Sequence, residues 1–69
     1  MTDNVYSISE IVGTSPEGVD QAIRNAITRA SRTLRNLDWF EVAEVRGYLD
    51  EGAIQHFQVR LKVGFRLEE

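Results

Sequence analysis

Five side chains in this sequence are of types that bind or transform ligands: Trp39, Arg46, His56, Gln58 and Arg66. Trp39 is the only tryptophan, and its indole offers a large, flat, electron-rich surface. An amide can pair with the polar edge of a ring, and a guanidinium group can bind an anion. Near the edge of a strand, such side chains form a platform for a flat, charged ligand. The alternative is that Trp39 is a core residue or fills an interface.

Catalytic and metal-binding side chains are sparse. The chain has no cysteine and one histidine, which excludes disulfides, thiolate metal sites and a histidine cluster. His56 is the only candidate general base, and a lone histidine in a strand is more often structural. We therefore predict no catalytic residue, no metal site and no enzyme activity.

Length and charge limit the functional classes further. With 69 residues the chain forms at most one domain, over residues 1–69. A domain this small is marginally stable alone, and without cysteines oligomerisation is the remaining means of stabilisation. The net charge of −3 argues against general nucleic-acid binding. No apolar run reaches the ~20 residues of a membrane span, and the first residues do not resemble a signal peptide. We therefore expect a soluble, cytoplasmic protein.

The first half of the chain predicts a strand followed by a helix. Residues 5–12 are rich in β-branched side chains and are typical of a strand that Gly13 and Thr14 end. Ser15 can cap the helix that follows, with Pro16 at its first position. An alanine-rich apolar stripe with helical spacing extends to Leu37, so a sheet can approach this helix closely, and Asn36 is the expected terminator.

The second half predicts a hairpin. Residues 39–49 form the second strand, residues 50–52 the turn, and residues 57–67 the third strand. In the third strand apolar residues alternate strictly with polar residues or glycine, so one face is apolar. The fold class is therefore α+β: a β-α-β-β subunit with a three-stranded antiparallel sheet packed on one helix. Because such strands are longer than the helix, apolar positions including Phe65 and Leu67 extend beyond it and are expected to contact other subunits.

Four segments together resemble the dodecins, which are small flavin-binding proteins. These are Glu-Ile-Val-Gly-Thr-Ser at 10–15, Leu-Asp-Trp-Phe-Glu-Val at 37–42, Phe-Gln-Val at 57–59 and Val-Gly-Phe-Arg-Leu-Glu at 63–68. The resemblance covers nearly the whole chain in the same element order, without gaps. It implies a hollow homododecamer that holds flavins in pairs at interfaces between subunits. From the charge and the lack of a long apolar run, neither a membrane nor a nucleic acid is expected as a partner.

The resemblance also implies roles for four residues. Trp39 would stack on the isoalloxazine ring, Gln58 would hydrogen-bond its polar edge, and Arg46 would bind the phosphate of FMN. Arg66 would belong to a second site that holds coenzyme A in some bacterial members. FMN is the expected cofactor, with riboflavin or FAD as alternatives, and the implied function is flavin storage, buffering and quenching of flavin photochemistry.

Other interpretations of these residues stay open at this point. Gln58 on a polar strand face is commonly solvated, Arg46 could pair with an acidic neighbour, and Arg66 could form a salt bridge between subunits. At the level of function, the alternatives are a structural homo-oligomer that binds no ligand and a small flavoenzyme. The absence of a glycine-rich nucleotide loop weighs only weakly against the enzyme.

Overall fold

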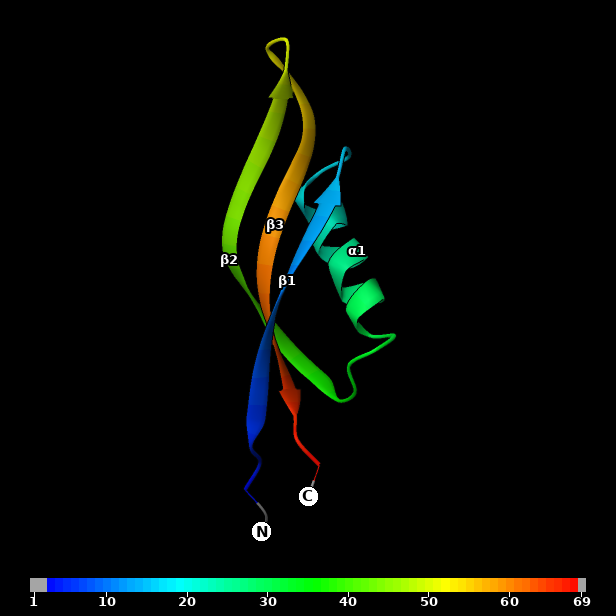
Figure 1. Cartoon of the computed structure of the whole chain (residues 1–69), viewed down its shortest axis with the longest axis vertical. Coiled ribbons are helices and arrows are strands. Elements are labelled where there is room, and N and C mark those ends of the chain that lie inside the picture. The colour runs from blue at the N-terminus through cyan, green and yellow to red at the C-terminus, as the bar shows by residue number, and fades with distance from the viewer. Residues whose placement is uncertain (1–2, 69) are drawn as a thin grey trace.

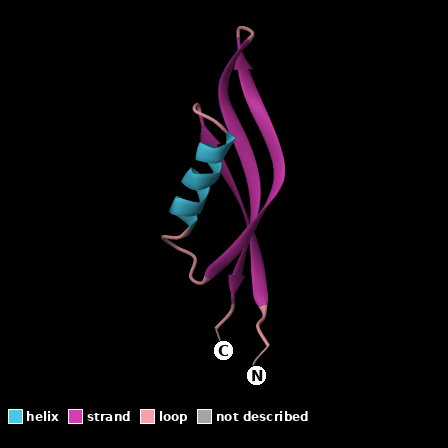
Figure 2. Cartoon of the chain, turned by 180° about the vertical axis from the view of Figure 1, so that it is seen from behind, coloured by secondary structure: helices cyan, strands magenta, loops and turns pink. Residues whose placement is uncertain are grey.

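The computed structural model describes residues 3–68, in which one helix packs on a three-stranded sheet. The elements in chain order are β1 (Tyr6–Ser15), α1 (Val19–Ala30), β2 (Leu37–Asp50) and β3 (Ala53–Arg66). The sheet is antiparallel in the order β1-β3-β2, so β3 is the central strand. Helix α1 lies on one face of this sheet, and the other face is bare (Figures 1 and 2). The predicted α+β class and β-α-β-β order are confirmed.

The first strand is longer than predicted because Gly13 does not end it. Gly13 and Thr14 lie inside β1, which continues to Ser15. A β-carbon on Gly13 would collide with the carbonyl oxygen of Ala22 and lie 2.8 Å from Cβ of Ala26. The glycine therefore lets α1 approach the sheet closely, as the alanine-rich stripe predicted. The core forms at this contact, where Ala22 and Ala26 pack with two central residues of β3, Val59 and Leu61.

The start of the helix differs from the prediction. Helix α1 begins at Val19, Gly18 occupies the N-cap position, and no side chain caps the first turn. The hydroxyl oxygen of Ser15 accepts a hydrogen bond from the backbone N–H of Glu17 at 3.0 Å instead. The prediction that Ser15 caps the helix, with Pro16 in the first helical position, is therefore wrong. The hydroxyl stabilises the turn that precedes the helix.

The helix also ends earlier than the apolar stripe predicted. It stops at Ala30, so it has twelve residues, and Leu34 and Leu37 lie outside it. The backbone N–H groups of Thr33 and Leu34 both donate to the carbonyl oxygen of Ala30, which tightens and terminates the last turn. Asn36, the predicted terminator, lies beyond this turn with φ 63°, a left-handed conformation that asparagine tolerates. Its role is to direct the chain into β2.

The central strand confirms the predicted alternation. Val59, Leu61 and Val63 are fully buried towards α1, whereas the residues between them face the other side of the sheet. The strand starts at Ala53, earlier than predicted, and stops one residue before Leu67. The turn at Glu51 and Gly52 has positive φ at both positions, the geometry that favours a tight hairpin.

The β2-β3 hairpin extends far beyond the helix, as Figure 1 shows, and gives the chain extents of 56 × 20 × 14 Å. β1 reaches only as far as Phe57 of β3, so the end of the hairpin has no third strand beside it. Leu49 and Ile54, near the hairpin turn, are 69% and 62% exposed. Leu67 is exposed as predicted, whereas Phe65 is half-buried. Apolar side chains are therefore left uncovered beyond the helix, which is typical of surfaces that contact another protein.

Candidate functional site

Trp39 lies near the start of β2, opposite Gly64 of β3. A β-carbon on Gly64 would collide with Cε2 and Cζ2 of the indole and lie 2.6 Å from its Nε1. The indole therefore lies over the backbone of β3, in space that any side chain at this position would occupy. Trp39 remains 40% exposed, so it is not a core residue of the single chain. One side of the ring is supported by the sheet, and the ring keeps surface available for a ligand.

Tyr6 of β1 supports the same indole from its edge. The two rings are 6.4 Å apart between centroids and inclined by 78°, an edge-to-face arrangement. The Tyr6 hydroxyl donates a 2.8 Å hydrogen bond to Oδ2 of Asp38. This bond raises the pKa of Tyr6, because the neutral phenol is the form that can donate to the carboxylate. Asp38, which precedes Trp39, thus joins β1 to β2 across the central strand.

Gln58 and Arg46 face each other directly across β3 and β2. Both lie on the sheet face opposite α1, because their positions alternate with the buried residues of β3. Nη2 of Arg46 donates to Oε1 of Glu44 at 2.9 Å, so the alternative that Arg46 pairs with an acidic neighbour is confirmed within one chain. This hydrogen bond lowers the pKa of Glu44 and raises that of Arg46. An amide and a cation are therefore placed side by side on an open surface.

The stacking residue and the amide are not brought together within one chain. Gln58 lies six positions before Gly64, the residue beneath Trp39, along the same strand. At ~3.3 Å for each residue this corresponds to about 20 Å. A single tricyclic ring cannot bridge that distance. A ring stacked on Trp39 would therefore lie away from Gln58 of the same chain.

Arg66 lies at the end of β3 opposite Tyr6, at the Trp39 end of the sheet and away from Gln58. Its backbone N–H donates to the carbonyl oxygen of Asn36 at 3.0 Å, and its carbonyl oxygen accepts from Nδ2 of Asn36 at 3.2 Å. Its side chain lines a shallow hollow of about 240 Å³ next to the loop that follows α1. Arg66 and Arg46 therefore belong to different regions of the surface.

His56 stacks on Tyr48 of the neighbouring strand, with ring centroids 4.8 Å apart and planes inclined by 13°. This cross-strand pair gives the histidine a structural contact, in line with the interpretation from the sequence. Within residues 3–68, no three His, Asp or Glu side chains are grouped so as to hold a metal ion. In the same range no helix has the length and apolar character needed to cross a membrane.

Two residues of the site were not identified from the sequence: Gly64 and Tyr6. A signal for Gly64 was present, because a glycine inside a strand often marks the close approach of another group. In the third strand, Gly64 takes the place of a polar residue in the alternating pattern, at the position that faces Trp39. No comparable signal existed for Tyr6, because its contact with Trp39 depends on the order of strands in the sheet.

Comparisons of the sequence and of the fold with known proteins all identify dodecins as similar proteins. The family model described as Dodecin matches residues 5–68. A curated dodecin from Thermus thermophilus is 57% identical over 65 residues, which cover 94% of each chain. The dodecin structure from Streptomyces davaonensis is 68% identical with a TM-score of 0.94, covering 99% of this chain and 100% of the other. The Streptomyces coelicolor dodecin structure is 64% identical with a TM-score of 0.93, covering 100% and 99% respectively.

Proposed function

The chain belongs to the dodecin family, and on this basis we propose that it is a non-enzymatic flavin-binding protein that prefers FMN. The observation that carries the proposal is the placement of Trp39, which the sheet supports on one side and leaves 40% exposed. A supported but accessible indole suits a flat aromatic ligand, because offset stacking adds ~0.5–1.5 kcal/mol to the burial of apolar area.

Three side chains would hold the flavin. Trp39 would stack on the ring, while Gln58 would use its donor and its acceptor to pair with the ring's polar edge. Arg46 would bind the phosphate through charge-assisted hydrogen bonds, which would favour FMN over riboflavin. When bound, a flavin supplies a planar, electron-poor and light-absorbing ring. Trp39 is electron-rich, so its contact would quench the fluorescence of that ring, as storage or protection from light requires.

We propose that the binding unit is a hollow homododecamer in which each flavin lies between copies of the chain. Two observations support association. The separation of Trp39 from Gln58 along the sheet favours a site shared between copies, and the apolar side chains that α1 leaves uncovered offer a surface for a partner copy. A site on a two-fold axis would hold paired ligands, because the same patch then contacts itself. A cytoplasmic location belongs to this proposal on the basis of the sequence.

Arg66 is assigned to a second site, separate from the proposed flavin site. Coenzyme A stays a prediction from the family resemblance, and the hollow beside Arg66 is only the part of a site that one chain supplies. The position of Arg66 supports only the narrower statement that any ligand it binds would lie apart from Gln58 and Arg46.

Titration with FMN tests the proposed function against its two alternatives. We expect flavin and tryptophan fluorescence to fall together and to saturate near one FMN per chain. Because this chain has a single tryptophan, the protein signal reports on Trp39 alone. The absence of quenching with every flavin would leave the structural oligomer as the explanation. Steady oxidation of NADH by the loaded protein would support a flavoenzyme instead.

Light scattering tests the proposed assembly. We expect a mass of about 95 kDa, twelve times the 7.9 kDa of one chain, in both the free and the flavin-loaded protein. The physical reason is that a small domain with uncovered apolar strands is marginal alone. A stable monomer at micromolar concentration would contradict both the assembly and a site shared between copies.

A further inference from the structure

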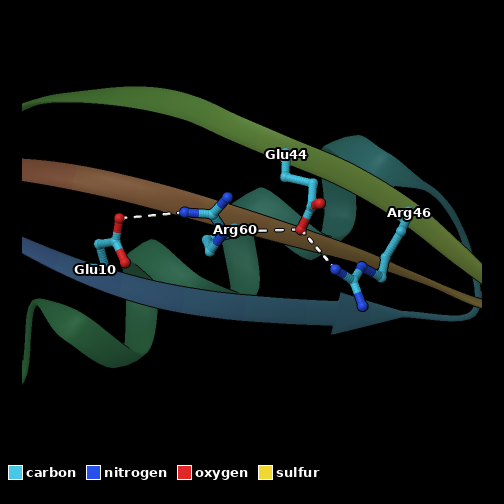
Figure 3. A network of polar contacts seen from close by, with 4 residues as sticks. All are labelled: Glu10, Glu44, Arg46 and Arg60. Atoms are coloured by element: carbon cyan, nitrogen blue, oxygen red, sulfur yellow. Dashed lines mark hydrogen bonds and ion pairs between the residues drawn. The ribbon is translucent and has the colours of Figure 1, made fainter.

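Four charged side chains alternate in sign across the sheet face that bears Gln58 (Figure 3). Glu10 of β1 accepts a hydrogen bond from Arg60 of β3 at 3.2 Å. Nε of Arg60 lies 3.7 Å from Oε1 of Glu44 in β2, and the same oxygen accepts the hydrogen bond from Arg46. The charges of this row cancel. Among residues 3–68, Arg46 lies at the end of this row and contacts one carboxylate, whereas Glu44 contacts two guanidinium groups.

From this arrangement we infer that Glu44 sets the preference between phosphorylated and unphosphorylated flavins, by competing with the ligand phosphate for Arg46. The inference rests on the proposed function, because it assumes that flavin binds beside Gln58. A carboxylate and a phosphate offer a guanidinium group the same kind of charged oxygen acceptors. The contact with Glu44 occupies Nη2 of Arg46 and offsets part of its charge. A phosphate that binds the same N–H groups must displace this contact, and one that binds the remaining N–H groups meets a cation already paired with a carboxylate.

Two features make it feasible for a ligand phosphate to replace Glu44 as the partner of Arg46. The side chains of Arg46 and Glu44 are 52% and 41% exposed, and ion pairs at such exposure are weak because water screens them. Arg60 also remains beside Glu44 when Arg46 turns away, so the carboxylate keeps a partner. The lowered pKa of Glu44, caused mainly by the hydrogen bond from Arg46, favours the charged form that competes with the phosphate.

The test compares Kd values for FMN and riboflavin, which differ only by the phosphate, in the full-length assembled protein. Glu44→Gln keeps an oxygen acceptor of nearly the same shape and removes the charge. We expect the preference for FMN over riboflavin to rise about two- to fivefold, the range that corresponds to an exposed ion pair. Riboflavin affinity should change little, because riboflavin has no group that competes for Arg46.

Glu41→Gln is the matched control, because it removes the same charge from the same exposed strand, and Glu41 lies opposite Lys62 rather than beside Arg46. It should leave the preference unchanged. In an Arg46→Ala background, Glu44→Gln should also lose its effect. An unchanged or reduced preference in Glu44→Gln, or an equal rise in Glu41→Gln, would overturn the inference while flavin binding itself persists. Failure of the unaltered protein to bind either flavin would instead overturn the proposed function.

Discussion

Trp39→Ala is expected to lower the affinity for FMN by about two orders of magnitude. The substitution removes the stacking surface and the apolar area that a ligand would cover on the exposed part of the indole. Together these are worth roughly 3 kcal/mol, which corresponds to ~100-fold in Kd. Titration of purified protein with FMN, followed by flavin fluorescence, measures the change directly. The same titration should show weaker quenching at saturation, because the electron-rich partner is gone.

A second variant at the same position separates stacking from a general loss of structure. Trp39→Phe keeps an aromatic ring of smaller area, so we expect its FMN affinity to lie between those of the unaltered protein and Trp39→Ala. Both variants should keep the mass of the unaltered assembly in light scattering. An affinity for FMN that is the same in all three proteins would rule out a stacking role for Trp39.

Gly64→Val is expected to have an effect of similar size, although residue 64 need not touch the ligand. Its β-carbon would occupy the space of Cε2 and Cζ2 of the indole, and the two methyl groups would add to the collision. The side chain of Trp39 must then leave the position that the sheet now supports. We expect FMN affinity to fall by ~100-fold and the thermal midpoint to fall as well, because overpacking at a buried position typically costs ~1–3 kcal/mol.

Gly47→Ala provides the matched control for this prediction. A β-carbon at Gly47 of β2 would have the carbonyl oxygen of His56 as its nearest neighbour, at an ordinary 3.7 Å. This variant should bind FMN like the unaltered protein. In a Trp39→Ala background, Gly64→Val should cost much less FMN affinity and stability, because the collision partner is absent. Additive losses in the double variant would show that Gly64 acts independently of the indole.

The periodic parts of the fold were predictable, and the ends of the elements were not. The alternation in β3 predicted which residues the helix buries, because a pleated strand directs successive side chains to opposite faces. The helical spacing of apolar residues as far as Leu37 wrongly predicted a helix of that length. The same spacing is also compatible with a chain that leaves the helix and enters a strand. Local hydrogen bonds to the carbonyl of Ala30 decided where α1 stops, and spacing carries no information on them.

The candidate site was predictable in its residue types but not in its geometry. The resemblance pointed to Trp39, Gln58 and Arg46, and the structure places Arg46 beside Gln58 while separating both from Trp39. Trp39 and Arg46 are separated along the same strand, β2, whereas the position of Gln58 relative to them depends on the register of β2 on β3, which shifts at several points along the hairpin. Such irregularities cannot be located from an alternating pattern, because each shifts the pairing without changing the amino-acid types. The support of the indole by Gly64 follows from the same register.

The separation of Trp39 from Gln58 within one chain has a thermodynamic consequence. In the proposed site each copy holds only part of the ligand. The free energy of ligand binding therefore stabilises the association between copies. By linkage, dilution of the protein should release ligand even when the free ligand concentration is held constant. Conversely, saturating ligand should protect the assembly against dissociation by mild denaturant. The fraction of sites occupied then depends on the concentration of the protein as well as on that of the free ligand. A Kd measured at one protein concentration therefore does not predict occupancy at another.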